Sequence, residues 1–472
     1  MTSASETLLR RLPSVDKLLG SDSLKSLAAA TPHSILVDSA RTALEEARQG
    51  LLKGSCASSS ESHLLSWTLA RACDLIHIAM RPHFRKAVNA TGIILHTGLG
   101  RAVLPPKALA QIRDHLAGYS LLQVDVDSGK RSRRDSRIEW LLQRLTGAPA
   151  ATVVNNNAAA TMLVLNTLGR NREVIVSRGQ LVEIGGSFRL PDVMTASGVR
   201  LVEVGTTNKT HPRDYENAIN ENTAAILRVH PSNYKLVGFT SEVPLEELVR
   251  IAHAHALPLI DDLGAGALID FSRFGFQKEP TLPDSIVAGA DLVTASGDKL
   301  IGAAQAGIIL GRPDLIERVR KNPISRMVRI DKLCLAALEA TLSLFLDDAV
   351  ALREVPTLRM LCRPLPEITA QARRLASAIS SSVPGVNASV IDGFSQMGSG
   401  SFPEQNLPTA LVRLEATSMT PDDLALALRR HEPPVVARIQ DDALLIDPRT
   451  LLDGDESVLL DAVRAAFAPE IM

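Results

Sequence analysis

One lysine, Lys299, lies in a sequence setting that suits covalent chemistry with an aldehyde. It follows an apolar stretch at 291–295, predicted as a strand, and precedes a loop of glycines and alanines that ends at Gly307. A lysine that forms a Schiff base must be able to swing, and small residues let a flat ring approach its loop. Enzymes that use pyridoxal phosphate place their reactive lysine in such a segment. Taken alone, the pattern also fits a surface lysine in a glycine-containing turn.

Two neighbouring carboxylates upstream supply a second part of the same predicted site. Asp261 and Asp262 end the apolar run 257–260, which is typical of a buried parallel strand. Ligands of open α/β sheets bind at the carboxyl ends of the strands. A carboxylate at that place would keep a pyridine nitrogen protonated. We predict that Asp261 is this partner, with Asp262 as the alternative, and that the other aspartate caps the following turn.

A third part is predicted where a strand leads into a helix, in the segment 151–163. β-Branched residues precede three asparagines at 155–157, and small residues then begin the helix. Free backbone N–H groups at a helix N-terminus bind phosphate, and small side chains let the phosphate come close. The alternative is an ordinary strand-to-helix turn with an N-cap. With the lysine and the aspartates, this order along the chain fits a fold-type-I pyridoxal phosphate enzyme.

The composition indicates a globular chain. It has 472 residues, of which 45% are hydrophobic and 22% charged, and a formal net charge of −1. No apolar run approaches the roughly eighteen residues of a membrane helix, and the first residues lack the pattern of a secretion signal. The four cysteines show neither metal-ligand spacing nor a paired framework, so we expect free thiols in a reducing cytoplasm. Any contact with nucleic acid must come from local basic patches.

Hydrophobic periodicity predicts an α/β fold with added helical and α+β parts. We expect a helical unit at 1–55, a linker and helix at 56–85, a large domain at 86–340 and a smaller domain at 341–472. In the large domain, alternating strands and helices predict a mostly parallel sheet covered on both faces. Its strands are expected at 151–154, 173–176, 200–204, 224–229, 257–260, 292–295 and 306–310. The smaller domain is expected to hold strands at 410–414, 435–439 and 443–446, and helices at 421–430 and 456–467.

Several longer runs resemble bacterial selenocysteine synthase, the family of L-seryl-tRNA(Sec) selenium transferases. The resemblance rests on the runs 89–101, 177–189, 203–210, 230–234 and 296–300, and it covers nearly the whole chain. The family pattern usually has asparagine where this chain has Gly98. The resemblance implies a fold-type-I transferase with pyridoxal 5'-phosphate as cofactor, a large domain with a mostly parallel sheet, a small α+β C-terminal domain and a helical N-terminal domain.

The resemblance also implies a reaction. L-seryl-tRNA(Sec) would become L-selenocysteinyl-tRNA(Sec) with selenophosphate as the selenium donor, through an aminoacrylyl intermediate bound to the cofactor. Lys299 would bind the cofactor and then remove the α-proton of the seryl group. Two alternatives are a pyridoxal phosphate lyase or aminotransferase for a free small amino compound, and a non-catalytic tRNA-binding protein that has kept the fold.

Further site residues are implied by the same resemblance. Asn157, Ala158 and Ala159 would hold the cofactor phosphate, and the anion-binding set would be Arg101, Arg326 and Arg329. Guanidinium groups suit a phosphate-like anion, and Arg326 and Arg329 would share one face of a helix. Thr206 and Thr207 would add hydroxyl donors near the anion, unless they cap a turn. The roles of Gln180 and Glu183, near the ring, stay open, and Arg438 is a weaker candidate.

The implied macromolecular partners are seryl-tRNA(Sec) and further copies of the chain. The N-terminal helical unit would recognise the shape of the tRNA. A basic segment, Lys130 to Arg137, would contact phosphate or the cofactor of a neighbouring subunit, or would be a solvated loop. Family members form a ring of dimers, which suggests a decameric homo-oligomer. No membrane partner is expected, and the expected location is the cytoplasm.

Overall fold

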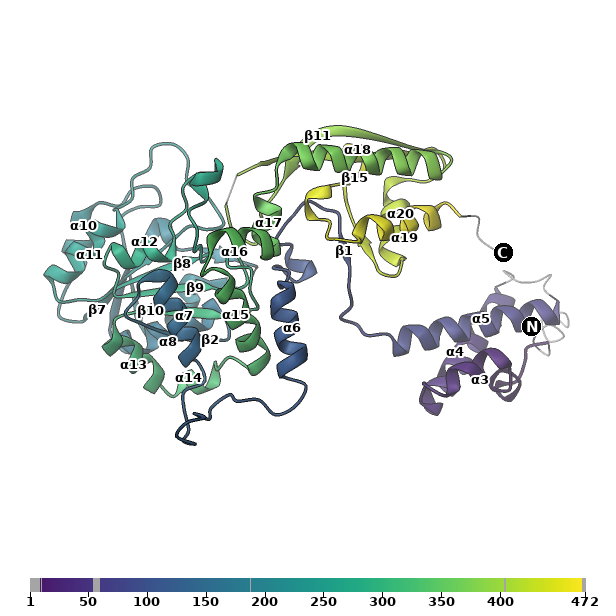
Figure 1. Cartoon of the computed structure of the whole chain (residues 1–472), viewed down its shortest axis with the longest axis horizontal. Coiled ribbons are helices and arrows are strands. Elements are labelled where there is room, and N and C mark those ends of the chain that lie inside the picture. The colour runs from purple at the N-terminus through teal and green to yellow at the C-terminus, as the bar shows by residue number, and fades with distance from the viewer. Residues whose placement is uncertain (1–8, 10, 54–59, 187, 403–404, 469–472) are drawn as a thin grey trace. The chain divides into compact units, whose positions relative to one another are not determined.

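The computed structural model describes residues 9, 11–53, 60–186, 188–402 and 405–468. The chain divides into two compact units, Met1–Lys86 and Ala87–Met472 (Figure 1). The serine-rich segment 54–59, predicted as part of a linker, lies outside the described residues. Among the described helices, none has the length and apolarity to cross a membrane.

The first unit is a small helical bundle. It contains α2 (Val15–Leu19), α3 (Asp22–Ala28), α4 (His33–Leu52) and α5 (Glu61–Met80). Serine side chains at three helix starts accept backbone N–H groups that would otherwise lack a partner. All four helices contribute to one core, formed by Leu18, Leu24, Leu36, Ala40, Ala43, Ala72 and Ile76. Because α5 buries two of these residues, the unit extends to Lys86 and does not end at residue 55.

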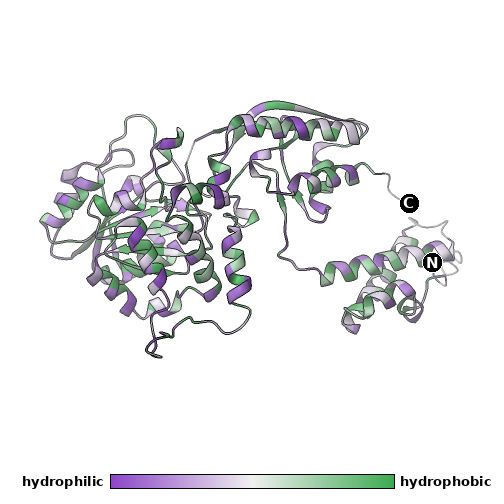
Figure 2. Ribbon diagram, in the orientation of Figure 1, coloured by the Kyte–Doolittle hydropathy of each residue, from purple (hydrophilic) through white to green (hydrophobic). Residues whose placement is uncertain are grey.

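The second unit is built on a seven-stranded sheet in the order β2-β10-β9-β8-β7-β3-β6. Nearly all its strands lie within two residues of their predicted positions, because continuous apolar runs mark strands that are buried on both faces. Only β8 extends further, through the two aspartates and beyond. The bounds are β2 (Ala150–Val154), β3 (Glu173–Ser177), β6 (Arg200–Val204), β7 (Thr223–Val229), β8 (Leu259–Gly264), β9 (Leu292–Ser296) and β10 (Gly307–Gly311). Figure 2 shows hydrophobic residues, in green, along strands of this sheet.

The strand directions bring distant segments to one edge of the sheet. The neighbours β9, β8, β7, β3 and β6 are parallel. β10 is antiparallel to both β9 and β2, so β2 runs in the same direction as β9. The carboxyl ends of six strands therefore share one edge, where α/β proteins bind their ligands. The prediction of a mostly parallel sheet is confirmed.

Helices cover both faces of this sheet and form two cores. One core takes residues from α7 (Ser136–Thr146), α11 (Leu245–Ala254), α12 (Leu282–Val287) and α15 (Lys332–Leu344). The other takes residues from α8 (Asn157–Gly169), α9 (Leu190–Ala196) and α13 (Pro313–Lys321). Figure 1 shows these helices around the strands.

The C-terminal part has a sheet of its own, in the order β11-β12-β15-β14. Its elements are α18 (Leu365–Ser382), β11 (Val386–Ser395), β12 (Leu407–Ala416), α19 (Pro421–Arg430), β14 (Arg438–Gln440), β15 (Ala443–Ile446) and α20 (Asp455–Ala466). Two short strands, β13 (Val435–Val436) and β14, replace the single strand predicted at 435–439. β13 pairs in parallel with β1 (Val88–Asn89), which the sequence assigns to the large domain. β11 was not predicted, because its half-exposed residues give no apolar run.

Candidate active site

A cavity of about 450 Å³ lies at the shared carboxyl edge of the large sheet. Lys299, three residues past the end of β9, lines it together with Asp262 of β8 and residues that follow β2 and β7. This volume lies in the range of small-molecule and cofactor sites. The polar residues that line this cavity include Arg101, Asn157, His230, Ser232, Asn233, Asp262, Asp298 and Lys299.

Lys299 is buried, with 7% of its surface exposed. Burial lowers the pKa of its amine, while the carboxylates of Asp262 and Asp298 act in the opposite direction. Water cannot stabilise the charged form of this amine well, so the neutral form is populated at a lower pH than in a surface lysine. A neutral amine is the form that attacks an aldehyde. The surface-turn alternative for Lys299 is therefore wrong.

The two aspartates of β8 point to opposite faces of the sheet, as successive strand residues must. Asp261 is fully buried and lies away from the cavity lining. Its Oδ1 accepts a hydrogen bond from Arg228 Nη1 at 2.8 Å, and its Oδ2 accepts one from Ser285 Oγ at 2.7 Å. The side chain that faces the cavity is Asp262. The structure thus corrects the choice of Asp261 and favours the alternative.

Asp262 is held by donors from the start of α8. Its Oδ1 accepts from Asn157 Nδ2 at 2.9 Å, and its Oδ2 accepts from Thr161 Oγ1 at 2.9 Å. Burial raises the pKa of Asp262, and these hydrogen bonds oppose that shift. A cation placed over this carboxylate would stabilise its charged form. Asp262 therefore suits a positively charged ring nitrogen.

The N-terminus of α8 meets the same cavity through Asn156, Asn157 and Ala158. Asn156 is the N-cap, and its side chain accepts the N–H of Ala159. Ala159 therefore does not offer its N–H to a ligand, contrary to the expected cradle of three residues. The first N–H groups of a helix have no acceptor within it, so the backbones of Asn157 and Ala158 are the donors suited to a phosphate.

Arg101 reaches the cavity from a turn far away in the sequence. The turn follows the short 3-10 helix η1 (Thr97–Leu99), and Arg101 has a left-handed backbone with φ of 63°. Such a conformation is uncommon for a residue other than glycine. Its Nη1 donates to Asp298 Oδ2 at 2.7 Å, directly beside Lys299. Arg101 is the one member of the predicted anion set that the structure brings to this cavity within a single chain.

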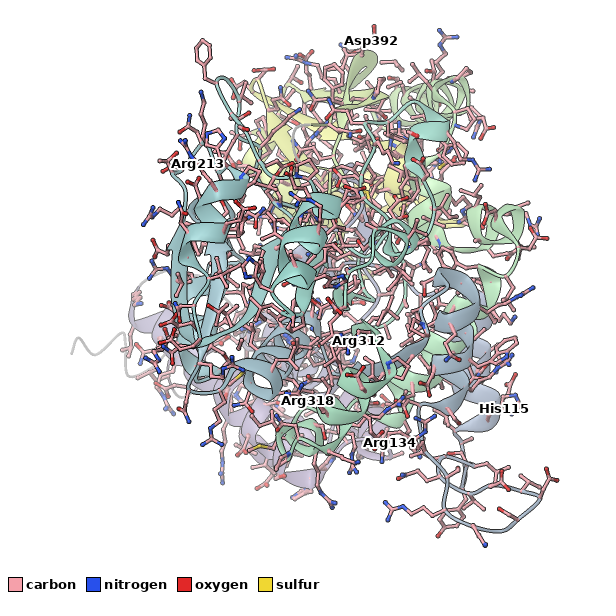
Figure 3. The ribbon with its side chains drawn as sticks, turned by 90° about the vertical axis from the view of Figure 1, so that its left-hand side faces the viewer. His115, Arg134, Arg213, Arg312, Arg318 and Asp392 are labelled. Atoms are coloured by element: carbon pink, nitrogen blue, oxygen red, sulfur yellow. The ribbon has the colours of Figure 1, made fainter. Side chains whose placement is uncertain are left out.

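Arg326 and Arg329 are placed elsewhere. α14 (Ile324–Met327) contains Arg326 but ends before Arg329, so the two do not share a helix face as predicted. Both are exposed, and neither is among the described residues that line the Lys299 cavity. Arg134 donates to the carbonyl of Ile330, next to Arg329 in the chain. Burial and the nearby charges of Arg329 and Arg131 lower the pKa of Arg134. The charge of the predicted basic segment thus adjoins Arg329 (Arg134 is labelled in Figure 3).

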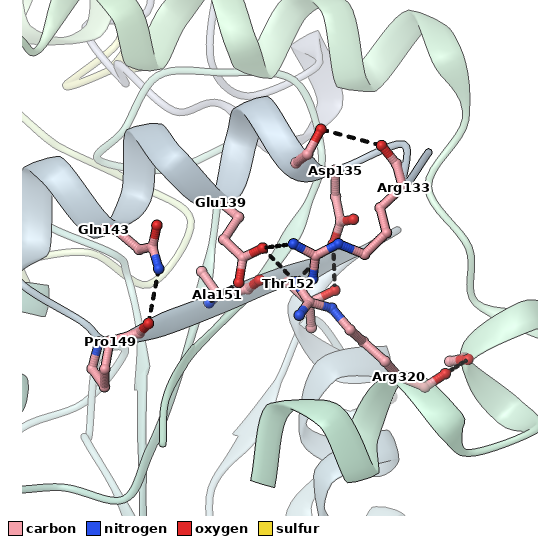
Figure 4. Close-up of polar contacts among 10 residues, drawn as sticks. Arg133, Asp135, Glu139, Gln143, Pro149, Ala151, Thr152 and Arg320 are labelled. Atoms are coloured by element: carbon pink, nitrogen blue, oxygen red, sulfur yellow. Dashed lines mark hydrogen bonds and ion pairs between the residues drawn. The ribbon is translucent and has the colours of Figure 1, made fainter. Parts of the chain in front are cut away.

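The basic segment is tied to the sheet by a buried ionic cluster (Figure 4). Arg133 forms an ion pair with Glu139 at 2.5 Å, and Arg320 pairs with Glu139 at 3.0 Å and with Asp135 at 3.5 Å. Thr152 Oγ1 of β2 donates to Asp135 at 2.7 Å. Arg133 therefore has a structural role, and Arg134 donates to Ile330 O and Gln123 Oε1. Lys130, Arg131, Arg133 and Arg137 are exposed, as the solvated-loop alternative expects.

One of the two predicted threonines, Thr207, lies at a second cavity, which shares His230 with the first, whereas Thr206 is not among the described residues that line either cavity. Gln180 also lines this second cavity. Thr206 Oγ1 donates to Lys209 O at 3.0 Å, which is the turn-capping alternative. Gln180 is buried, and its Oε1 accepts the N–H of Val229 at 3.1 Å.

Two further candidates make structural contacts. Glu183 pairs with Arg189 at 3.3 Å on the surface, and its carbonyl accepts from Asn233 Nδ2 at 2.9 Å. Arg438 lies in β14, where its Nη2 donates to Phe394 O at 3.0 Å. The contacts of Arg438 are therefore those of a residue that stabilises the C-terminal sheet.

Comparisons with known proteins agree with this geometry. The family model described as "L-seryl-tRNA selenium transferase" matches residues 87–452. The chain belongs to this family. A second model, described as "Selenocysteine synthase N terminal", matches residues 9–48. The resemblance stated from the sequence is confirmed.

Members of the family align over almost their full length. An L-seryl-tRNA(Sec) selenium transferase of Desulfomicrobium baculatum is 47% identical over 464 residues, covering 98% of this chain and 99% of that one. One of Alkaliphilus oremlandii is 42% identical over 457 residues, covering 96% and 97%. Among solved structures, D-glucosaminate-6-phosphate ammonia-lyase has a TM-score of 0.56 at 22% identity, covering 83% of this chain and 97% of that one. This likeness concerns the fold, and the predicted fold class is confirmed.

Several lining residues of this family member were given no site role from the sequence, although they lie in the runs 230–234 and 296–300 that carry the resemblance. His230, Ser232 and Asn233 follow β7 and line the cavity, and Asp298 holds Arg101. His230 Nε2 lies 2.8 Å from Glu279 Oε2. Their position just past a predicted strand could have identified them, because the residues that follow parallel strands lie at the edge of the sheet where ligands bind.

Proposed function

We propose that this chain converts L-seryl-tRNA(Sec) to L-selenocysteinyl-tRNA(Sec) with pyridoxal 5'-phosphate as its cofactor. One observation carries the proposal. A buried lysine with a lowered pKa shares a cavity with a buried carboxylate and a helix N-terminus, in a chain that belongs to the selenium transferase family over nearly its whole length.

The residues of the cavity fit the cofactor one group at a time. Lys299 supplies the amine for its aldehyde, Asp262 a counter-charge for its ring nitrogen, and the α8 N-terminus donors for its phosphate. When bound, pyridoxal phosphate supplies an electron sink for charge that develops at the α-carbon. Asn157 Oδ1, Ser232 Oγ and Asn233 Oδ1 are buried polar atoms at this cavity without a hydrogen-bond partner among the residues that the structure describes. Such atoms fit a polar ligand that could pair with them.

Lys299 then has a second task once the amino group of the substrate takes its place. Its neutral Nζ is positioned to take the α-proton of the seryl group. Burial favours this role, because a neutral amine accepts a proton and an ammonium does not. Asp298 restrains Arg101 beside this amine through their 2.7 Å ion pair.

We propose that Arg101 binds the anionic selenium donor, selenophosphate. Its guanidinium lines the cavity and offers the forked donors that suit phosphate oxygens. Arg326 and Arg329 do not line the cavity within one chain. Their joint action with Arg101 is proposed to depend on a neighbouring copy in a homo-oligomer, for which the family suggests a decamer built as a ring of dimers. The proposed location is the cytoplasm.

The helical unit Met1–Lys86 is proposed to bind the tRNA. Its described part from residue 9 to 48 matches the family's N-terminal model. Phosphate contacts would make this affinity depend on salt concentration. Removal of the unit is expected to abolish turnover of seryl-tRNA while the cofactor stays bound.

The decisive assay combines purified protein, seryl-tRNA(Sec) and labelled selenophosphate. We expect label to appear in the aminoacyl group of the tRNA, and no turnover of free serine. Turnover of a free amino compound without RNA would instead identify a lyase or an aminotransferase. Absence of the visible absorbance of a lysine-bound cofactor would indicate a protein that binds tRNA without catalysis.

A further inference from the structure

One hydroxyl group at the cavity, Ser232 Oγ, is buried without a partner. Ser232 is 2% exposed, and its Oγ is among the buried polar atoms that neither accept nor donate a hydrogen bond within the described part of the chain. It lines the Lys299 cavity. Leaving a buried hydroxyl unpaired costs free energy, so such a group in a cavity points to a ligand atom.

The sheet order fixes where this hydroxyl lies relative to the other groups. Along the carboxyl edge, α8 follows β2, Lys299 follows β9, Asp262 lies in β8 and Ser232 follows β7. The order of strands is β2-β10-β9-β8-β7, so the strand that leads into α8 and the strand that leads to Ser232 lie on opposite sides of β9 and β8. Ser232 Oγ also lies 3.3 Å from the place that a side chain at Gly264 would fill, just beyond Asp262.

The substituents of pyridoxal phosphate have a fixed order around its ring. The aldehyde carbon stands opposite the ring nitrogen, and the two positions that flank it carry the phosphate arm and a hydroxyl. With the nitrogen at Asp262, the aldehyde at Lys299 and the phosphate at α8, the ring hydroxyl must face the β7 side. That is the side of Ser232.

Hydrogen-bond chemistry selects Ser232 among the unpaired groups. The ring oxygen carries negative charge when the cofactor is bound to lysine, so it needs a donor. The unpaired atoms of Asn157 and Asn233 are their Oδ1 atoms, and an amide oxygen can only accept a hydrogen bond. A serine hydroxyl can donate as well as accept.

We propose that Ser232 is a cofactor-binding residue whose hydroxyl donates a hydrogen bond to the ring oxygen of pyridoxal phosphate. The inference rests on the proposed cofactor and assigns a contact beyond the lysine, the carboxylate and the phosphate site. The donor stabilises the ionised oxygen after the proton shared with the Lys299 nitrogen has left. Without it, that proton is held more tightly.

The test is a pH titration of the visible absorbance of the full-length protein loaded with pyridoxal phosphate. In Ser232→Ala the midpoint is expected to rise by about one pH unit, the size of one hydrogen bond to a charged group. Ser232→Thr keeps the hydroxyl and is expected to titrate near the wild-type midpoint. Ser401→Ala is the matched control, because Ser401 Oγ is also buried and unpaired but does not line the cavity.

A cofactor analogue provides the second measurement. With 3-deoxypyridoxal phosphate, which lacks the ring hydroxyl, wild type and Ser232→Ala should bind with equal affinity, whereas pyridoxal phosphate should bind the variant more weakly. Identical titrations and affinities for the two proteins with pyridoxal phosphate would overturn the inference and leave the proposed function intact. If wild type shows no visible band with the cofactor, the proposed function and this inference both fail. If Ser232→Ala does not fold, a wild-type midpoint in Ser232→Thr supports the contact, and a raised one opposes it.

Discussion

Two buried polar networks in this chain differ in whether their hydrogen-bonding capacity is used. In the C-terminal part, Asp447 is fully buried and accepts from Ser395 Oγ at 2.7 Å and Thr409 Oγ1 at 2.9 Å. Arg449 donates to Ser395 Oγ, Met360 O and Pro408 O, and links several segments. At the large sheet, Asp262 is equally well held, but the polar atoms around it are not all paired.

The difference in pairing distinguishes a network that stabilises the fold from one that is suited to bind a ligand. A closed network satisfies each buried group within the protein, so it contributes to stability and leaves nothing to offer. An open network keeps unpaired atoms, a lysine with a lowered pKa and a carboxylate with a raised pKa in one cavity. These features cost stability and favour binding. The four predictions below test this distinction, from the largest expected effect to the smallest.

Lys299→Ala should have the largest effect. It should reduce activity without lowering the stability of the protein. Loss of the covalent link and of the base should reduce selenium transfer by about 10³-fold or more. The visible cofactor band should vanish, while the melting temperature stays equal or rises because a buried amine is removed. Lys321→Ala is the control, since that lysine is 75% exposed and pairs only with Glu317 at the surface. A variant that kept the band would contradict the assignment.

Arg449→Met should act in the opposite way. It removes the positive charge near the buried carboxylate of Asp447 and the donors to Ser395 Oγ, Met360 O and Pro408 O, and breaking such a buried ionic network costs about 3–5 kcal/mol. We expect a lower denaturant midpoint in urea unfolding, with a normal cofactor spectrum in the protein that remains folded. Adding Asp447→Asn to this variant should recover part of the lost stability. Unchanged stability in Arg449→Met would show that the closed network is dispensable.

Asp262→Asn should reduce selenium transfer by about 10²-fold. Removal of one preorganised electrostatic group from an enzyme active site typically has an effect of this size. Its stability should change little, because a carboxylate whose pKa is raised by burial gains from becoming neutral. Asp261→Asn is the matched control on the same strand. It should lose stability through its pair with Arg228 and keep its catalytic rate constant when folded. The reverse pattern would restore Asp261 as the ring partner.

The pH dependence of cofactor capture gives the smallest effect. Capture needs a neutral amine, so its rate should rise with pH and level off at a lower pH than for an exposed lysine, because burial lowers the pKa of Lys299. Asp262 raises that pKa, so the midpoint should fall further in Asp262→Asn. Stopped-flow absorbance of the apoprotein mixed with pyridoxal phosphate measures both midpoints. A midpoint that does not move in the variant would show that Asp262 lies too far from the amine to affect it.

Much of the fold was predictable because strands that are buried on both faces of a sheet appear in the sequence as continuous apolar runs. The strand at 292–295 and the glycine-rich loop after it predicted the place of Lys299, and the helix at 421–430 matched α19. β11 was missed, since its half-exposed residues lack an apolar run. The helix at 61–80 was found, but its membership of the first unit depends on packing against α4 that periodicity cannot show.

The site divides in the same way. Residue types and order predicted the lysine, a carboxylate and a phosphate-binding helix start, because each belongs to a local strand-end pattern. The choice between Asp261 and Asp262 depended on which face of β8 meets the cavity. Asp262 lines the cavity, whereas Asp261 accepts a hydrogen bond from Arg228. The separation of Arg326 and Arg329 from Arg101 was equally hidden, since it depends on where α14 ends and packs.

The sequence by itself determined the fold class and the family, and it predicted the reactive lysine, because strand periodicity, strand-end residues and long motifs are local properties of the chain. Only the tertiary structure decided which polar atoms are satisfied and which are left open toward the cavity. That decision belongs to the structure because hydrogen bonds such as Asn157 to Asp262 join residues that are 105 positions apart. No local pattern specifies how such distant groups meet.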